Sequence, residues 1–171
     1  MELDEGEPLP GHGEFDAIVA MGGPMSVNDD DRFPWLGEEK RLIGESVRGG
    51  TPFWGACLGL QLLAASLGAE VYPGSLPEVG VMNVELADAV IDDPVFRGLP
   101  RSLLTLQWHG DTFDLPEGAV RLAGSSAYPN QAFRWGERAY GVQFHLEVTR
   151  DLARQWAVVP EYAAYADRVL G

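Results

Sequence analysis

The segment TPFWGACLGLQLLAASLG, residues 51–68, carries the strongest structural signal in this sequence. Its first part, TPFWG, is a short apolar run that is typical of a buried strand. Its second part, LGLQLLAASL, has apolar residues at helical spacing and is followed by Gly68, which ends a helix readily. The residues on one face of that helix are Leu60, Leu63, Ala64 and Leu67. The segment therefore predicts a strand that turns sharply into a helix.

A similar strand and helix precede this segment. The run FDAIVAM, residues 15–21, is closed by Gly22-Gly23-Pro24, as expected for a strand buried on both faces that ends in a turn. The run PWLGEEKRLIGESVR, residues 34–48, is amphipathic, and two glycines follow it. Its apolar face carries Leu36, Ile43 and Val47. Strand, helix, strand and helix in this order predict an α/β sandwich with a mainly parallel central sheet.

Past Gly68 the sequence becomes rich in β-forming residues. We expect five short strands, because these runs are separated by turn signals. The runs are GVMNVEL (80–86), LLTLQW (103–108), AVRLAG (119–124), QAFRW (131–135) and AYGVQF (139–144). Residues 148–159 and 160–170 are expected to form terminal helices, the first with Thr149 as its N-cap.

The composition limits the class of protein. A chain of 171 residues with 46% hydrophobic residues is long enough for one globular domain. Its 26 Asp and Glu residues against 12 Lys and Arg give a net charge of −14, which argues against nucleic acid and membrane surfaces as partners. There is one cysteine, and we find neither a signal-peptide pattern nor an apolar run of about 20 residues. We therefore expect a cytoplasmic protein.

The single cysteine lies at a position that is typical of a catalytic nucleophile, the turn between a predicted strand and a predicted helix. Gly55-Ala56-Cys57-Leu58-Gly59 has the spacing of a G-x-S-x-G elbow, with sulfur in place of oxygen. A thiol at a helix N-terminus meets unpaired N–H groups and the positive end of the helix dipole, so we expect a lowered pKa for Cys57. A free cysteine also packs often as a small buried hydrophobe. The elbow by itself leaves both interpretations open.

A thiol nucleophile needs a base and a group that orients the base. The histidines are His12, His109 and His145. His12 lies in a Gly/Pro-rich stretch and is interpreted as a surface residue. His145 follows a predicted strand, and in extended geometry Glu147 points the same way. We therefore predict a Cys57-His145-Glu147 triad; the alternative is a solvent-exposed pair at a strand end.

Acyl transfer also needs N–H donors for the developing oxyanion. The backbone N–H of Leu58 directly follows the nucleophile and is one candidate. The second is Gly23, in the turn after the first apolar strand, because neighbouring strands of a parallel sheet end at one crevice. The alternative interpretation of Gly22-Gly23-Pro24 is a turn without function.

Four motifs together resemble the class I glutamine amidotransferases, in particular stand-alone proteins similar to the glutaminase domain of GMP synthase. They are MGGPMSV (21–27), GACLGLQLLA (55–64), QWHGDTF (107–113) and YGVQFHLEVT (140–149), and the resemblance spans residues 15 to 150. It implies that Cys57 attacks the side-chain amide of glutamine and forms a γ-glutamyl thioester, which water hydrolyses. His145 then acts as base and as acid towards ammonia, and Glu147 orients it.

The same resemblance implies further features. Gln61 would contact the glutamine substrate, and the backbone around Trp108 and His109 would hold its amino-acid end. The fold would be a flavodoxin-like three-layer sandwich. Family members usually open with a strand and a helix before the segment that starts this chain, so residues 1–171 are expected to form a single, N-terminally truncated domain without the usual first strand. The common "HPE" of the family is "HLE" here.

The sequence also limits the chemistry. No Gly-rich ATP-binding loop followed by Lys is found, so either the ammonia acceptor lies on a separate synthetase chain or the enzyme only hydrolyses its substrate or transfers γ-glutamyl groups. We expect no cofactor and no metal. Three alternatives stay open. They are a metal-dependent oxygenase that uses His109, Asp111 and His145, a cysteine hydrolase of γ-glutamyl or peptide substrates, and a catalytically silent binding or regulatory domain.

Overall fold

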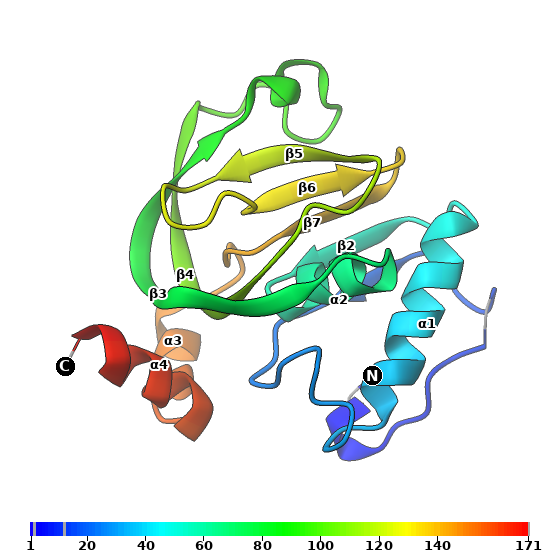
Figure 1. Ribbon diagram of the computed structural model, residues 1–171, viewed down its shortest axis with the longest axis horizontal. Coiled ribbons are helices and arrows are strands. Elements are labelled where there is room, and N and C mark those ends of the chain that lie inside the picture. Colours follow the sequence, from blue (N-terminus) through cyan, green and yellow to red (C-terminus); the bar gives the residue numbers. More distant parts are fainter. Residues whose placement is uncertain (2, 12, 171) are drawn as a thin grey trace.

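The computed structural model describes residues 1, 3–11 and 13–170 and arranges their strands in one seven-stranded sheet (Figure 1). The order across the sheet is β1-β2-β7-β6-β5-β3-β4. The strands are β1 (Ile18–Ala20), β2 (Phe53–Ala56), β3 (Val71–Leu86), β4 (Ser102–Phe113), β5 (Ala119–Gly124), β6 (Ala132–Trp135) and β7 (Ala139–Val142). All five strands that were expected after Gly68 are present.

The predicted α/β fold is confirmed, but its sheet is mixed and not mainly parallel as expected. The pairs β1/β2 and β2/β7 are parallel, whereas β7/β6, β6/β5, β5/β3 and β3/β4 are antiparallel. The physical reason lies in the connections. A parallel neighbour needs a long crossover, such as the helix between β1 and β2, while short turns such as the one between β6 and β7 join antiparallel neighbours.

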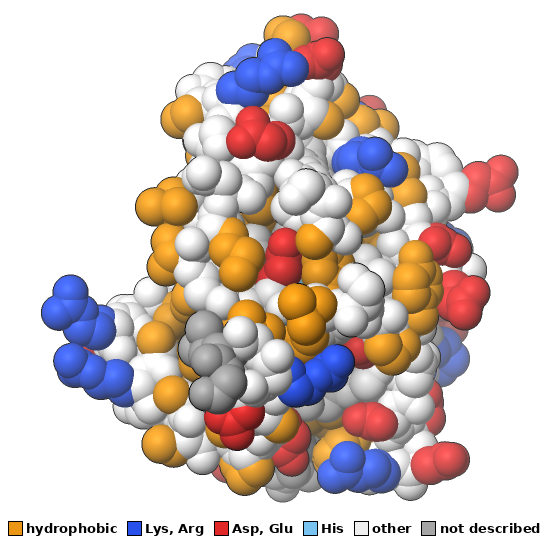
Figure 2. All heavy atoms as spheres, turned by 60° about the vertical axis from the view of Figure 1, so that its left-hand side comes forward, with side chains coloured by type: hydrophobic (Ala, Val, Ile, Leu, Met, Phe, Trp, Pro, Cys, Tyr) orange, Lys and Arg blue, Asp and Glu red, His pale blue; other side chains and the backbone are white. Residues whose placement is uncertain are grey.

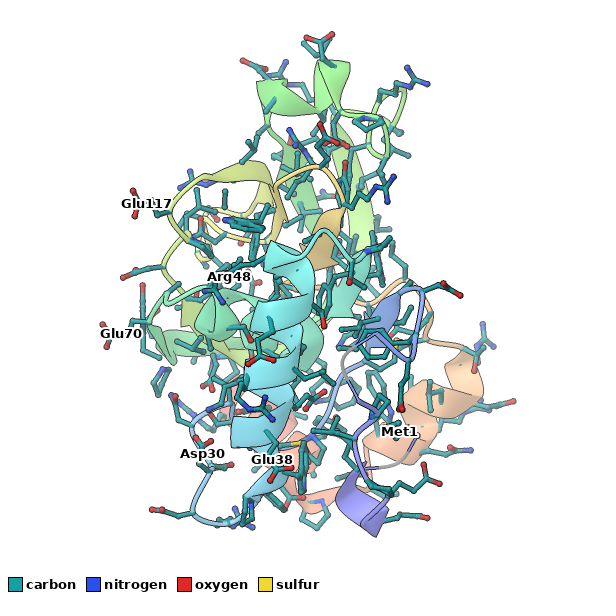
Figure 3. The ribbon with its side chains drawn as sticks, turned by 90° about the vertical axis from the view of Figure 1, so that its right-hand side faces the viewer. Met1, Asp30, Glu38, Arg48, Glu70 and Glu117 are labelled. Carbon is teal, nitrogen blue, oxygen red and sulfur yellow. The ribbon has the colours of Figure 1, made fainter. Side chains whose placement is uncertain are left out.

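The helices are α1 (Trp35–Arg48), α2 (Leu58–Ser66), α3 (Arg150–Trp156) and α4 (Pro160–Leu170), with 3-10 turns η1 (Leu3–Glu5) and η2 (Asp88–Asp92). The predicted apolar face of α1 is confirmed, because its three residues Leu36, Ile43 and Val47 are buried. Figure 3 shows α1 crossing one side of the molecule with Glu38 near its start and Arg48 at its end. Both charges are favourably placed for the helix dipole.

The strands alternate between two cores, as period-2 geometry requires. On β6 and β7, Phe133 and Ala139 belong to the core beneath α1 and α2. Their neighbours Ala132 and Tyr140 belong to a second core on the opposite face, which includes Phe96 from the segment after η2. The sheet is therefore covered by helices on one face and by the η2 segment on the other.

Strand β1 lies at an edge of the sheet and is not buried on both faces as expected. Val19 at its centre is 64% exposed. A strand is buried on both faces only if elements cover both of its sides, and this depends on distant parts of the chain. The opposite edge is the curved β3–β4 hairpin, and the side that carries it has hydrophobic side chains among polar atoms (Figure 2). Among the exposed ones are Leu76, Val81 and Leu104.

The C-terminal helices pack beside the β3–β4 hairpin (Figure 1). The predicted N-cap of α3 is confirmed, because the hydroxyl of Thr149 accepts a hydrogen bond from the backbone N–H of Leu152 at 3.2 Å. Within the described ranges no helix is long and apolar enough to span a bilayer.

Candidate active site

Cys57 lies at the junction of β2 and α2 in a strained backbone conformation. Its φ is 52° and its ψ is −107°, and it is the single non-glycine residue with positive φ in the described part of the chain. Such a conformation costs about 1–3 kcal/mol and is typical of functional sites. The flanking glycines make the turn sterically feasible. A Cβ atom on Gly55 would lie 2.6 Å from the Gly59 carbonyl carbon, and one on Gly59 would lie 2.1 Å from the Ala20 carbonyl oxygen.

The Cys57 thiol is buried, with 7% of the residue exposed. Its Sγ lies 3.9 Å from the Trp108 carbonyl oxygen, and the Gln143 side-chain amide donates a hydrogen bond to it at 3.6 Å. Burial raises the pKa of Cys57 to about 12; the Leu58 N–H and Gln143 act in the opposite direction, and the charge of Glu147 adds to the rise. The expectation of a lowered pKa is therefore wrong for this closed site. Desolvation outweighs the helix terminus.

His145 and Glu147 form a hydrogen-bonded pair in the segment that directly follows β7. His145 Nδ1 lies 2.6 Å from Glu147 Oε1, and the backbone N–H of His145 donates to the Leu106 carbonyl. Burial lowers the pKa of His145, although the hydrogen bond with Glu147 opposes this shift. A Cβ atom on Gly22 would lie 3.2 Å from His145 Cε1 and 3.6 Å from Cys57 Cβ. Both side chains thus border the small space at Gly22.

A chain of side-chain amides extends this site. Gln61 Nε2 donates to Gln143 Oε1 at 3.2 Å and lies 3.5 Å from the Asp111 carbonyl oxygen. Gln143 was missed by the sequence analysis. The sequence signal for Gln143 is the alternation that continues from the predicted strand AYGVQF, because residues 143, 145 and 147 would point to the same side of an extended chain.

The other predicted site residues gather around the same cavity. Gly23, Cys57 and Gln61 line it together with Trp108 and His109. Gly23 also packs against Leu58, since a Cβ atom there would lie 2.9 Å from Leu58 Cδ2. The structure thus brings the eight predicted site residues together around Cys57. His12, the third histidine, lies outside the described residues.

Helices α3 and α4 close this cavity. Tyr162 and Tyr165 of α4 line it, and a Cβ atom on Gly110 would meet the Tyr165 ring at 2.7 Å. The Trp108 indole N–H donates to the Tyr162 carbonyl at 3.1 Å, and the Trp156 ring packs edge-on against His145 at 4.7 Å. The remaining cavity has a volume of about 20 Å³, which is room for about one water molecule.

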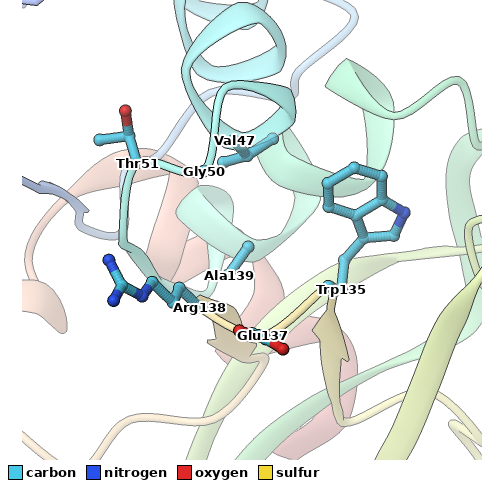
Figure 4. Close-up of a pocket in the computed structure, with 8 residues that line it drawn as sticks. Val47, Gly50, Thr51, Trp135, Glu137, Arg138 and Ala139 are labelled. Carbon is cyan, nitrogen blue, oxygen red and sulfur yellow. The ribbon is translucent and has the colours of Figure 1, made fainter.

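A larger cavity of about 370 Å³ lies at the other end of the parallel strands (Figure 4). It is bordered by Val47, Thr51 before β2, and the turn between β6 and β7 with Trp135 and Arg138. Cys57 directly follows the carboxyl end of β2, whereas this cavity lies where β2 and β7 begin. Its lining includes no thiol, hydroxyl-base pair or histidine among the described residues, so it offers no nucleophilic chemistry.

The metal-dependent alternative has no support in the geometry. Among the residues that the structure describes, no group of three or more His, Cys, Asp or Glu side chains is placed to hold one ion. The three proposed ligands His109, Asp111 and His145 therefore do not form a common site. His109 instead directs its ring towards Glu78, 3.2 Å away.

Comparison with known proteins points in the same direction as the geometry. Residues 3–156 match the family model described as glutamine amidotransferase class-I. The chain is 34% identical over 148 residues to a glutamine amidotransferase-like protein, YfeJ, of Salmonella typhimurium, covering 84% of this chain and 62% of that protein. It is 35% identical over 138 residues to one of the subunits of the glutamine-hydrolysing GMP synthase of Sulfolobus acidocaldarius, covering 79% of this chain and 69% of that relative.

Solved structures show the same similarity. A glutamine amidotransferase from Thermotoga maritima superimposes with a TM-score of 0.82 at 40% identity, over 97% of this chain and 69% of that one. A second, from Methylobacillus flagellatus, gives a TM-score of 0.83 at 32% identity, over 92% and 63% of the two chains. The chain thus spans about two thirds of these relatives.

Proposed function

Because this chain belongs to the class I glutamine amidotransferase family, we propose that its Cys57 site hydrolyses the side-chain amide of glutamine and releases ammonia. One observation carries the proposal. A strained elbow holds a thiol, and a hydrogen-bonded His145-Glu147 pair borders the same space at Gly22. A nucleophile, a base and an orienting carboxylate are the parts that acyl transfer through a thioester needs.

In the first half of the proposed reaction, Cys57 Sγ attacks the amide carbon and its proton passes to His145 Nε2. Nδ1 of this ring is held by Glu147, so Nε2 is the nitrogen that can act. The backbone N–H groups of Leu58 and Gly23 would stabilise the oxyanion. His145 then gives its proton to the leaving nitrogen, which departs as ammonia and leaves a γ-glutamyl thioester on Cys57.

In the second half, water attacks the thioester carbon and passes a proton to His145. The carbon–sulfur bond breaks, the sulfur regains the proton, and glutamate leaves. In the closed site the pKa of the thiol is about 12 and that of His145 is below its ordinary value. In this closed state the resting pair is therefore a neutral thiol and a neutral imidazole.

Substrate entry requires helix α4 to move. A cavity of about 20 Å³ holds about one water molecule and cannot admit a glutamine side chain. Displacement of Tyr162 and Tyr165 would enlarge it and hydrate the thiol, and this would lower the pKa of Cys57 because burial is the main cause of its rise. Opening would thus provide both access and reactivity.

We propose that the ammonia serves an acceptor on another polypeptide. The Sulfolobus acidocaldarius relative is named as one component of a glutamine-hydrolysing GMP synthase, which supports a division between glutaminase and synthetase chains. Such a pair would work in the cytoplasm. The identity of the synthetase would be tested by pull-down from a native extract, followed by glutamine-dependent product formation with the purified partner.

The central experiment is labelling with 6-diazo-5-oxo-norleucine, a glutamine-like electrophile, followed by intact-mass analysis. We expect one adduct on the wild type and none on Cys57→Ala, with glutaminase activity lost in the same variant. His145→Gln tests the base, and its activity should fall by about 10²-fold or more. No adduct on a folded wild type would refute the glutaminase. An adduct without glutamine turnover, but with cleavage of γ-glutamyl or peptide substrates, would favour the cysteine hydrolase.

A further inference from the structure

A cluster of buried polar side chains lies beside the Cys57 site, and the proposed reaction makes no use of it. This buried polar cluster consists of Glu78 on β3, His109 on β4, and Ser125 and Gln131, which flank the β5–β6 connection. Glu78 and His109 are paired across the β3–β4 hairpin and are 8% and 2% exposed. Charged groups this deeply buried require partners, because desolvation disfavours an isolated charge.

Both ring nitrogens of His109 face oxygen atoms that accept hydrogen bonds. Nδ1 lies 3.2 Å from the carbonyl oxygen of Asp111, and Nε2 lies 3.2 Å from Glu78 Oε2. A carbonyl oxygen can only accept, so Nδ1 must carry a hydrogen. In a neutral ring Nε2 would then be an unprotonated acceptor that faces a carboxylate.

The surroundings of Glu78 favour its ionised form. Ser125 Oγ donates to Glu78 Oε1 at 3.0 Å, and Gln131 Nε2 donates to Glu78 Oε2 at 2.6 Å. With His109, three donors converge on the two carboxylate oxygens, and an ionised carboxylate accepts all three. Burial alone would raise the pKa of Glu78, but the hydrogen bond and charge of His109 and the two other donors lower it.

We propose that His109 is a buried imidazolium ion paired with Glu78, and that this pair positions the wall of the glutamine site. The wall is the segment from Trp108 to Asp111. Its two ends contact two residues of the site, because the Trp108 carbonyl contacts Sγ of the nucleophile Cys57 and the Asp111 carbonyl lies next to Nε2 of Gln61. His109 lies inside this segment and is held by its ring, so the ion pair fixes the backbone on both sides. The catalytic consequence rests on the glutaminase function proposed above.

The positive charge also acts across the cavity. Burial is the main cause that lowers the pKa of His145, and the charge of His109 acts in the same direction, so both favour the neutral imidazole that can accept a proton from Cys57. The charged and titratable groups that face His109 come from several elements. They are Glu78 of β3, Asp111 of its own strand, Tyr128 at a ring distance of 4.7 Å, Tyr165 of α4, and Cys57 and His145 across the cavity.

The protonation state can be read directly by 15N NMR of the histidine ring nitrogens in the full chain, without substrate. Variants His12→Gln and His145→Gln each remove one set of signals and thereby assign the set of His109. We expect both nitrogens of His109 to carry hydrogen at neutral pH. A neutral ring with one bare nitrogen would overturn the proposal. The spectrum needs no turnover, so an imidazolium in a protein without glutaminase activity would contradict the proposed function alone.

The positioning role is tested by Glu78→Gln, with Glu85→Gln as the matched control, an exposed glutamate on the same strand. In Glu78→Gln, His109 should become neutral, and KM for glutamine should rise by about tenfold with a smaller change in kcat. Glu85→Gln should change neither. An unchanged KM in a folded Glu78→Gln protein with neutral His109 would overturn the positioning role. Ser125→Ala leaves the Glu78 carboxylate in place, so His109 should stay an imidazolium in this variant. If Glu78→Gln fails to fold, a neutral His109 in Ser125→Ala would count against the ion pair.

Discussion

The substitution Gly59→Ala tests the physical basis of the elbow. Gly59 lies in the first turn of α2, where its Cβ position is 2.1 Å from the Ala20 carbonyl oxygen and 2.7 Å from the Ala20 carbonyl carbon. Ordinary contacts begin at 3.4 Å, so α2 and β1 would have to separate by roughly 1 Å. Overpacking of this kind costs about 3 kcal/mol, while alanine in a helix gains up to about 1 kcal/mol over glycine. We expect a net loss of about 2 kcal/mol in the free energy of unfolding.

The assay is urea unfolding, in which a loss of this size moves the midpoint down by about 1 M for an m-value near 2 kcal/mol/M. Gly37→Ala is the matched control. Gly37 is also helical, but its Cβ position meets only the Asp30 carboxylate, at 3.3 Å, so the same substitution should raise stability by up to about 1 kcal/mol. If Gly59→Ala is as stable as the wild type, the contact between α2 and β1 does not require a glycine at position 59.

Two further predictions concern the cap and the pH dependence of stability. Tyr165→Ala removes the ring that packs against Gly110. The rate at which iodoacetamide alkylates Cys57 should therefore rise by about tenfold, because the thiol becomes more accessible and its pKa falls. The control is Tyr72→Ala, which removes an exposed tyrosine, and equal alkylation rates in wild type and Tyr165→Ala would show that α4 does not limit access. Burial raises the pKa of Glu39 from 4.5 to about 7, so folding favours the protonated form of this side chain. The resulting contribution to the free energy of unfolding is fully present below the ordinary pKa of Glu39 and is lost as pH rises through about 7. Glu39→Gln should therefore be more stable than the wild type at about pH 8 and show a flatter profile of urea midpoint against pH; parallel profiles for the two proteins would contradict this origin of the shift.

Local patterns in the sequence determined the elements that surround the site. The apolar positions of α1 and the N-cap at Thr149 each depend on residues within a few positions of one another. Such neighbours meet in any fold that contains the element, so periodicity and spacing are sufficient evidence. The pairing of His145 with Glu147 is of the same kind, because two residues on one extended segment share a side.

Long-range packing decided the rest. Four of the six strand pairs are antiparallel, and no local pattern shows which strands become neighbours. The protonation chemistry also depends on distant elements. The helix terminus beside Cys57 is visible in the sequence, but the burial that raises its pKa is produced by the β3–β4 hairpin and by helices more than 90 residues away. The sequence thus determined which ionisable side chains are available at the site. The tertiary structure decided how far each of them is removed from solvent, and thereby its protonation state.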